Sequence, residues 1–110
     1  MKKIKVPIYD CTVYFTMDKD EYRKKLRVSD DQDFLTVCIG SDIYILIGDS
    51  FSGASSPPYL QCLTHECNHA AMHILGIAGV QFNFENQEAL CYLQDFIFRK
   101  TYEHSLKVIK

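Results

Sequence analysis

Two histidines and a glutamate stand close together in the middle of the chain, at a spacing that suits chemistry on a helix. His65, Glu66 and His69 form an H-E-x-x-H pattern. On a helix, residues four apart share one face about 6 Å apart along the axis, so both imidazoles can reach one Zn²⁺ ion at about 2.0–2.1 Å. The glutamate beside the first histidine can take a proton from water and return it to a leaving group. The pattern therefore predicts a zinc site with Glu66 as the general base.

The segment around these residues has the pattern of an amphipathic helix. Ser56 is a good N-cap and Pro57 suits the first helical position, and we expect the helix to run to about Leu75, with Gly76 and Gly79 ending it. One apolar stripe with spacings of three and four residues comprises Leu60, Leu63, Cys67, Ala70, Ala71 and Ile74. This stripe predicts the face that packs into the core.

The histidines lie on the other side of this helix, about 160–200° around the axis from Cys67. Between Tyr59 and Gln81 there is no Lys or Arg, although a solvated helix face usually carries such residues. We therefore expect the histidine face to be covered, and we favour a metal site over a chance pattern of exposed histidines.

A catalytic zinc needs a third protein ligand, and the same helix does not supply one. A metzincin-type site requires a glycine and a third histidine at positions held here by Met72 and Leu75, which excludes that class. His73 lies about 12 Å of helix rise from His65, so one ion cannot be bound by both. We expect His73 to line the cleft.

The third ligand is expected on a last helix, which Asn83 can cap and which should span residues 84–104. Glu88 comes 19 residues after His69, with a turn between them. We take Glu88 as the third ligand and Glu85 as the alternative.

Three further side chains lie within about 40° of Glu88 on this helix. Tyr92 is a candidate catalytic residue, because its hydroxyl can donate to an oxyanion, although simple packing also explains a tyrosine there. Asp95 either orients a histidine or forms an ordinary helical pair with Arg99.

A rival site uses Cys62, one turn before His65. Cys62, His65 and His69, with or without Cys91, would form a closed structural zinc site, because thiolates favour such sites. Cys62 is also explained as an inert small hydrophobe, which is the commoner role of such a cysteine. Two imidazoles and a carboxylate also suit iron and other transition metals.

These motifs resemble those of the gluzincin-type zinc metallopeptidases. The matching residues are His65-Glu66-x-x-His69 followed by Asn86-Gln87-Glu88-Ala89. In that group two histidines and a glutamate on the following helix bind zinc, and the motif glutamate is the general base. The resemblance covers residues 57–100 and implies these roles for His65, His69, Glu88 and Glu66. The short chain also looks like compact reading frames of phages and mobile elements.

The elements before the motif predict an α+β domain. Residues 4–16 alternate with period two and form one expected strand, in which Pro7 indicates an edge or an irregularity. Residues 18–27 suit a short solvated helix, and residues 34–39 and 42–47 suit a hairpin. The second hairpin strand either holds an extended peptide at an edge or is buried on both sides. Three strands, a short helix and two long helices look like the minimal zincin core of small SprT-like and ImmA-like domains.

Length and composition restrict the class of protein. A chain of 110 residues predicts one domain, residues 1–110, and a net charge of −2 disfavours nucleic-acid binding. No apolar run reaches the roughly 20 residues that span a membrane. Five cysteines without a C-x-x-C pair, and no export signal, predict reduced thiols and a cytoplasmic protein.

The preferred hypothesis is a zinc metallopeptidase that acts on a peptide or protein substrate. The alternative is a catalytically inactive, zincin-like zinc-binding interaction module or inhibitor.

Overall fold

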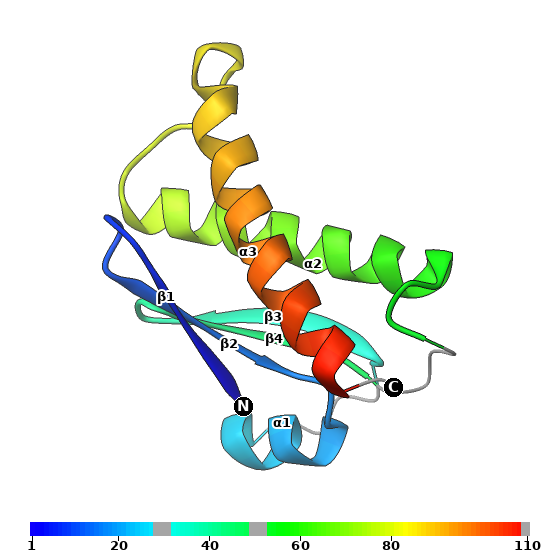
Figure 1. The fold of residues 1–110 in the computed structure, drawn as a ribbon. Coiled ribbons are helices and arrows are strands. Elements are labelled where there is room, and N and C mark those ends of the chain that lie inside the picture. Colours follow the sequence, from blue (N-terminus) through cyan, green and yellow to red (C-terminus); the bar gives the residue numbers. More distant parts are fainter. Residues whose placement is uncertain (28–31, 49–52, 109–110) are drawn as a thin grey trace.

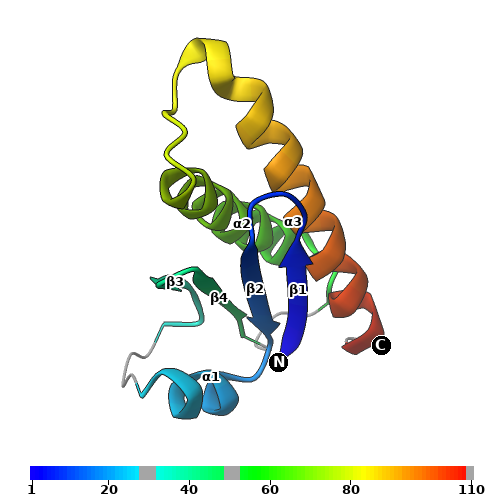
Figure 2. The same ribbon diagram turned by 90° about the vertical axis from the view of Figure 1, so that its left-hand side faces the viewer.

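The computed structural model describes residues 1–27, 32–48 and 53–108, which form a sheet and the helices around it. In chain order the elements are β1 (Lys2–Val6), β2 (Cys11–Thr16), α1 (Lys19–Leu26), β3 (Phe34–Ile39), β4 (Asp42–Ile47), α2 (Pro57–Ile77), the 3₁₀ turn η1 (Phe84–Asn86) and α3 (Gln87–Val108). Both long helices lie on one face of the sheet, and α1 lies at one end of the other face (Figures 1 and 2). The predicted α+β class is confirmed.

The sheet has four strands in the order β1-β2-β4-β3. Its two outer pairs are antiparallel, whereas the central pair, β2 with β4, is parallel. The crossover between the parallel strands consists of α1 and β3. Among the described strands, β1 and β3 are therefore the edges.

The N-terminal segment forms two strands where one was predicted over residues 4–16, so the expectation of a three-stranded sheet is wrong. The chain turns after Pro7, whose carbonyl accepts the Tyr9 N–H at 2.8 Å. Ile8 and Asp10 adopt positive φ values of 75° and 52° in this turn. Both strands bury alternate residues in the same core, so the period-two pattern is present on either side of the turn.

The hairpin of β3 and β4 has the predicted bounds. Gly40, in its turn, has a φ of 62°, a conformation that glycine adopts without a Cβ clash. β4 lies between β2 and β3, and residues 43–47 are all buried. The interpretation of β4 as a strand buried on both sides is therefore confirmed, and its interpretation as the edge is wrong. The edge strand beside α2 is β3.

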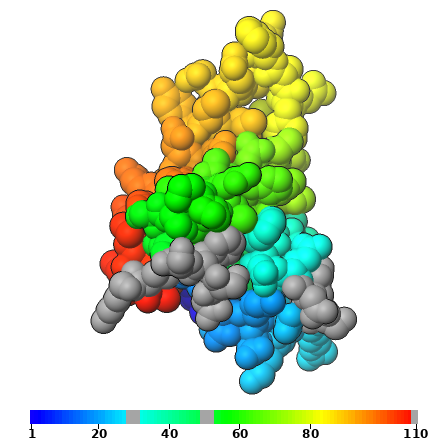
Figure 3. Space-filling view, turned by 90° about the vertical axis from the view of Figure 1, so that its right-hand side faces the viewer, coloured from blue at the N-terminus to red at the C-terminus, as the bar shows by residue number. Residues whose placement is uncertain are grey.

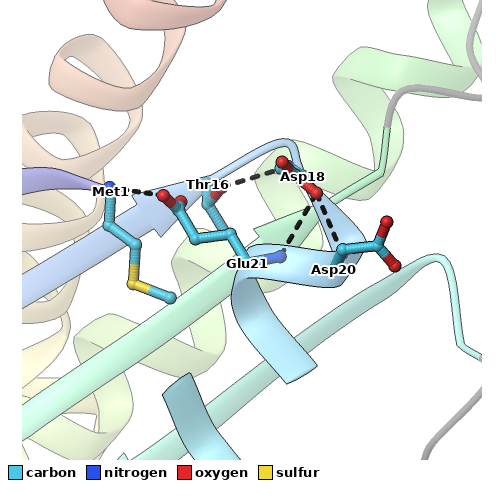
Figure 4. A network of polar contacts seen from close by, with 5 residues as sticks. All are labelled: Met1, Thr16, Asp18, Asp20 and Glu21. Atoms are coloured by element: carbon cyan, nitrogen blue, oxygen red, sulfur yellow. Dashed lines mark hydrogen bonds and ion pairs between the residues drawn. The ribbon is translucent and has the colours of Figure 1, made fainter. Parts of the chain in front are cut away.

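A small polar network joins α1 to the sheet (Figure 4). The Asp18 carboxylate caps the helix by accepting the N–H groups of Asp20 and Glu21, and the Thr16 hydroxyl accepts the Asp18 N–H at 3.0 Å. The amino group of Met1 lies 3.1 Å from Glu21 Oε2. The Thr16 hydroxyl, assisted by this amino group, lowers the pKa of Glu21. The predicted short helix is confirmed.

α2 packs over β3 and β4, with its predicted apolar stripe in the core. Leu60 is half-buried, and the fully buried members are Leu63, Cys67, Ala70, Ala71 and Ile74. The helix begins with Pro57, as predicted. The expected side-chain cap by Ser56 is not formed, because its hydroxyl donates to the Gly53 carbonyl at 2.8 Å. The helix continues to Ile77. Gly76 therefore remains inside the helix, and Gly79, with a φ of 78°, lies just beyond its end.

α3 crosses α2 and also contacts β1 (Figures 1 and 2). The Asn83 side chain caps its start, as predicted, by accepting the Asn86 N–H at 2.9 Å. The first turn is η1 rather than α-helix, and α3 continues to Val108. Of the helices that the structure describes, none has the length and apolar character needed to cross a bilayer.

Candidate active site

The two histidines of the H-E-x-x-H pattern meet on the outer side of α2. Their Nε2 atoms are 3.1 Å apart, and the ring planes are inclined by 72°. Their position opposite the buried stripe is the predicted one. However, the His65 side chain is 60% exposed, so over the described residues the expectation that this face is covered is wrong.

The separation of the two nitrogens fits two ligands of one zinc ion. If an ion lies about 2.05 Å from each nitrogen, a separation of 3.1 Å gives an N–metal–N angle of about 100°, near the tetrahedral value of about 109°. The same separation suits a hydrogen bond in which one ring donates to the other. Helix geometry alone thus brings the pair to a distance at which it can bind a metal.

Glu66 lies beside the histidine pair but is only 4% exposed. Its Oε2 atom is 3.9 Å from His65 Nε2, and its Oε1 atom accepts a hydrogen bond of 2.6 Å from the Thr36 hydroxyl. Thr36 was not predicted from the sequence, because no motif marks it. The only available signal was its alternation with Phe34 and Cys38 on one face of a predicted strand.

A pocket of about 390 Å³ opens along this side of α2. Its lining residues are Gln32, Phe34, Leu35, Thr36, His65, Glu66, His69 and His73. The prediction that His73 lines the cleft is confirmed. Figure 3 shows α2 in green between the orange-to-red turns of α3 and cyan β3, so the pocket lies on the side of α2 that faces β3.

The predicted third ligand is not gathered with the histidine pair. Glu88, in the first turn of α3, and Glu85, in η1, are both exposed. α3 contacts α2 further along, where Gln94 accepts from Asn68 Nδ2 at 3.0 Å and donates to the Thr64 carbonyl at 3.3 Å. The earlier turns of α3 extend beyond α2 (Figures 1 and 2). Within the described ranges, no three His, Cys, Asp or Glu side chains are grouped to hold a metal, so the role of Glu88 stays a prediction.

The other predicted residues of α3 lie at different depressions. Tyr92 is 69% exposed and lines an apolar pocket of about 310 Å³ between α3 and the β1–β2 turn, together with Ile8 and Phe96. Asp95 lines a neighbouring depression with Tyr92 and Arg99. The structure therefore does not bring the expected oxyanion donor or the expected orienting carboxylate to the histidine pocket.

All five cysteines are free thiols in the structure. Cys62 is half-buried against the core, and burial, with the nearby Glu66 carboxylate, raises the pKa of its thiol. Within the described residues, Cys62 and the two histidines are not grouped to hold a metal. Cys91 is exposed on α3. The rival structural site built on Cys62 gains no support from this arrangement.

Comparison of the chain with models of protein families, with curated proteins and with solved structures finds no match. The function is therefore inferred from the geometry of the site. That geometry consists of two converging imidazole nitrogens, a buried carboxylate bonded to Thr36, and a pocket along the edge strand β3.

Proposed function

We propose that this protein is a small zinc-dependent peptidase in which His65, His69 and Glu88 hold the metal and Glu66 is the general base. The observation that carries the proposal is the 3.1 Å separation of the two Nε2 atoms beside a buried carboxylate. When bound, zinc supplies Lewis acidity, which polarises a carbonyl group and lowers the pKa of water.

The surroundings of Glu66 suit a group that carries a proton. One carboxylate oxygen is bonded to Thr36, and the other lies 3.9 Å from His65 Nε2, on the side of the histidine pair. In the proposed reaction, Glu66 accepts a proton from the attacking water and then delivers it to the departing amine. Burial of the side chain limits competition from bulk solvent.

The free edge of β3 supports a peptide as the substrate. Among the described strands, β3 pairs only with β4. The two-residue turn makes Ile39 and Asp42 a hydrogen-bonded pair, and such pairs alternate along an antiparallel ladder. The bond from Gly48 N–H to the Asp33 carbonyl, at 2.6 Å, agrees with this alternation. The main-chain groups of Thr36 therefore point away from β4, where an extended peptide can pair with them.

The test compares the wild type with Glu66→Gln, each loaded with zinc. Glutamine keeps the shape of the side chain and can still accept from Thr36, but it cannot carry the proton. Both proteins are incubated with a mixture of unstructured peptides, and products are identified by mass spectrometry. We expect equal zinc contents by elemental analysis and a loss of cleavage of at least about 100-fold in the variant. Equal cleavage by the two proteins would refute the proposal.

A zinc-binding interaction module without catalytic activity is the second candidate. It is favoured by one observation, that only two nitrogen donors converge in the part of the chain that the structure describes. Stoichiometric zinc with no cleavage that depends on Glu66 would support this candidate over the peptidase.

A further inference from the structure

Thr36 connects the edge strand β3 to the buried carboxylate of Glu66. The hydroxyl oxygen lies 2.6 Å from Glu66 Oε1 and 3.2 Å from the Glu66 backbone carbonyl oxygen. A hydroxyl has one proton to donate, and the nearer, carboxylate oxygen is the stronger acceptor. A separation of 2.6 Å lies in the range of charge-assisted O–H···O⁻ hydrogen bonds.

This hydrogen bond restricts how the carboxylate is turned. The terminal torsion of a glutamate side chain is broad when nothing holds it. With Oε1 bonded to Thr36, Oε2 remains on the side of His65, 3.9 Å from its Nε2 atom. The contact thus selects the orientation in which one oxygen faces the histidine pair and the pocket.

Thr36 also lies where a substrate would pair with the sheet. Its side chain points toward α2, while its main-chain N–H and C=O point toward the free edge of β3. A peptide added to this edge would bond to the backbone of the residue whose side chain orients Glu66.

We infer that Thr36 is a positioning residue, which holds Glu66 in the orientation that proton transfer requires and links that orientation to the occupied strand edge. The inference rests on the proposed peptidase function. It deepens that proposal by assigning a role to a residue of β3, outside the H-E-x-x-H motif. Thr36 acts through Glu66, and its hydroxyl needs no contact with the reacting atoms.

The test uses Thr36→Val, which removes the hydroxyl at nearly constant shape, and Thr36→Ser, which keeps it. Thr12→Val, on β2, is the matched control for the same chemical change away from the pocket. Kinetic constants are measured on a peptide that the zinc-loaded wild type cleaves. We expect Thr36→Val to lower kcat about 10- to 100-fold with little change in KM. Thr36→Ser and Thr12→Val should stay within about threefold of the wild type.

Zinc content and the thermal unfolding midpoint are measured for every variant, so that a fall in kcat is separated from loss of metal or of fold. If Thr36→Val does not fold, Thr36→Ala is used in its place and is expected to give the same loss of kcat. If Thr36→Val keeps the wild-type kcat, the inference about Thr36 is wrong, although the proposed function stands. The same conclusion follows if Thr36→Ser is as slow as Thr36→Val. Absence of any cleavage that depends on Glu66 in the wild type overturns the proposed function and this inference with it.

Discussion

The third zinc ligand can be identified from the stability that zinc adds to the folded chain. The informative pair of variants is Glu88→Gln and Glu85→Gln, in which one carboxylate is exchanged for an amide of the same shape. Both glutamates are exposed, so each exchange should change the stability of the zinc-free protein by no more than about 0.5 kcal/mol. Any larger difference in the presence of zinc then reports the ligand.

The expected size of the effect follows from binding linkage. A metal that binds only the folded state adds about 2.7 kcal/mol at a free concentration of 100 times its Kd. For a chain of 110 residues, an unfolding entropy of about 2.1 cal/mol/K per residue converts 1 kcal/mol into about 4 °C, so zinc should raise Tm by about 12 °C. If removal of one ligand weakens binding about 100-fold, the remaining stabilisation is about 0.4 kcal/mol, or about 2 °C.

The assay is thermal unfolding followed by circular dichroism, at one fixed zinc concentration and in the presence of a chelator. The wild type and Glu85→Gln should show the full shift in Tm, Glu88→Gln about one sixth of it, and His69→Ala almost none. A full shift in Glu88→Gln would refute the assignment of Glu88. Loss of the shift in Glu85→Gln alone would move the assignment to Glu85.

Two further predictions concern the scaffold. Burial raises the pKa of Tyr59 to about 12 from 10.0, so this hydroxyl ionises at a lower pH in the unfolded state than in the folded state. The stability that it contributes is fully present below about pH 10 and is lost as the pH rises toward about 12. Between pH 8 and pH 11, the free energy of unfolding measured in urea should fall less in Tyr59→Phe than in the wild type. Equal falls in the two proteins would show that ionisation of Tyr59 is not the cause. Gly76 is helical and Gly79 has a φ of 78°, yet a Cβ would meet no atom within 4 Å at either position. In chemical denaturation, Gly76→Ala should therefore stabilise the fold by about 0.5–1 kcal/mol, because alanine favours the helix. Gly79→Ala should destabilise the fold by about 1–2 kcal/mol, because alanine disfavours a positive φ. If both variants changed stability in the same direction, this argument from backbone conformation would be wrong.

Elements with a local determinant were predictable from the sequence. The turn of the β3–β4 hairpin follows from Gly40, the start of α2 from Pro57, and the cap of the last helix from Asn83. The break between β1 and β2 was not predictable in the same way. Residues 7–10 form a turn that places Ile8 at positive φ, which a β-branched residue rarely adopts.

In the candidate site too, contacts within one element were predictable from the sequence, and contacts between elements were not. His65 and His69 meet because both belong to one helix, so their spacing in the sequence is enough to predict the contact. Thr36 is 30 residues from Glu66, and their contact depends on how α2 packs across β3. The place of Glu88 depends on how α3 crosses α2, which no local spacing specifies.

The mixed strand order of the sheet has a consequence for the speed of folding. β3 and β4 are joined by a two-residue turn, whereas Thr36 of β3 and Glu66 of α2, which form the two walls of the pocket, lie 30 residues apart in the chain. Of the described strand pairs, the parallel pair of β2 and β4 joins the residues that are farthest apart in the chain, for example Thr12 and Asp42. Hairpins close within about 1–10 μs, whereas distant pairings must first overcome the entropy of closing a long loop. We therefore expect the β3–β4 hairpin to form first, and the docking of β2 onto β4 and of α2 onto β3 to limit the folding rate.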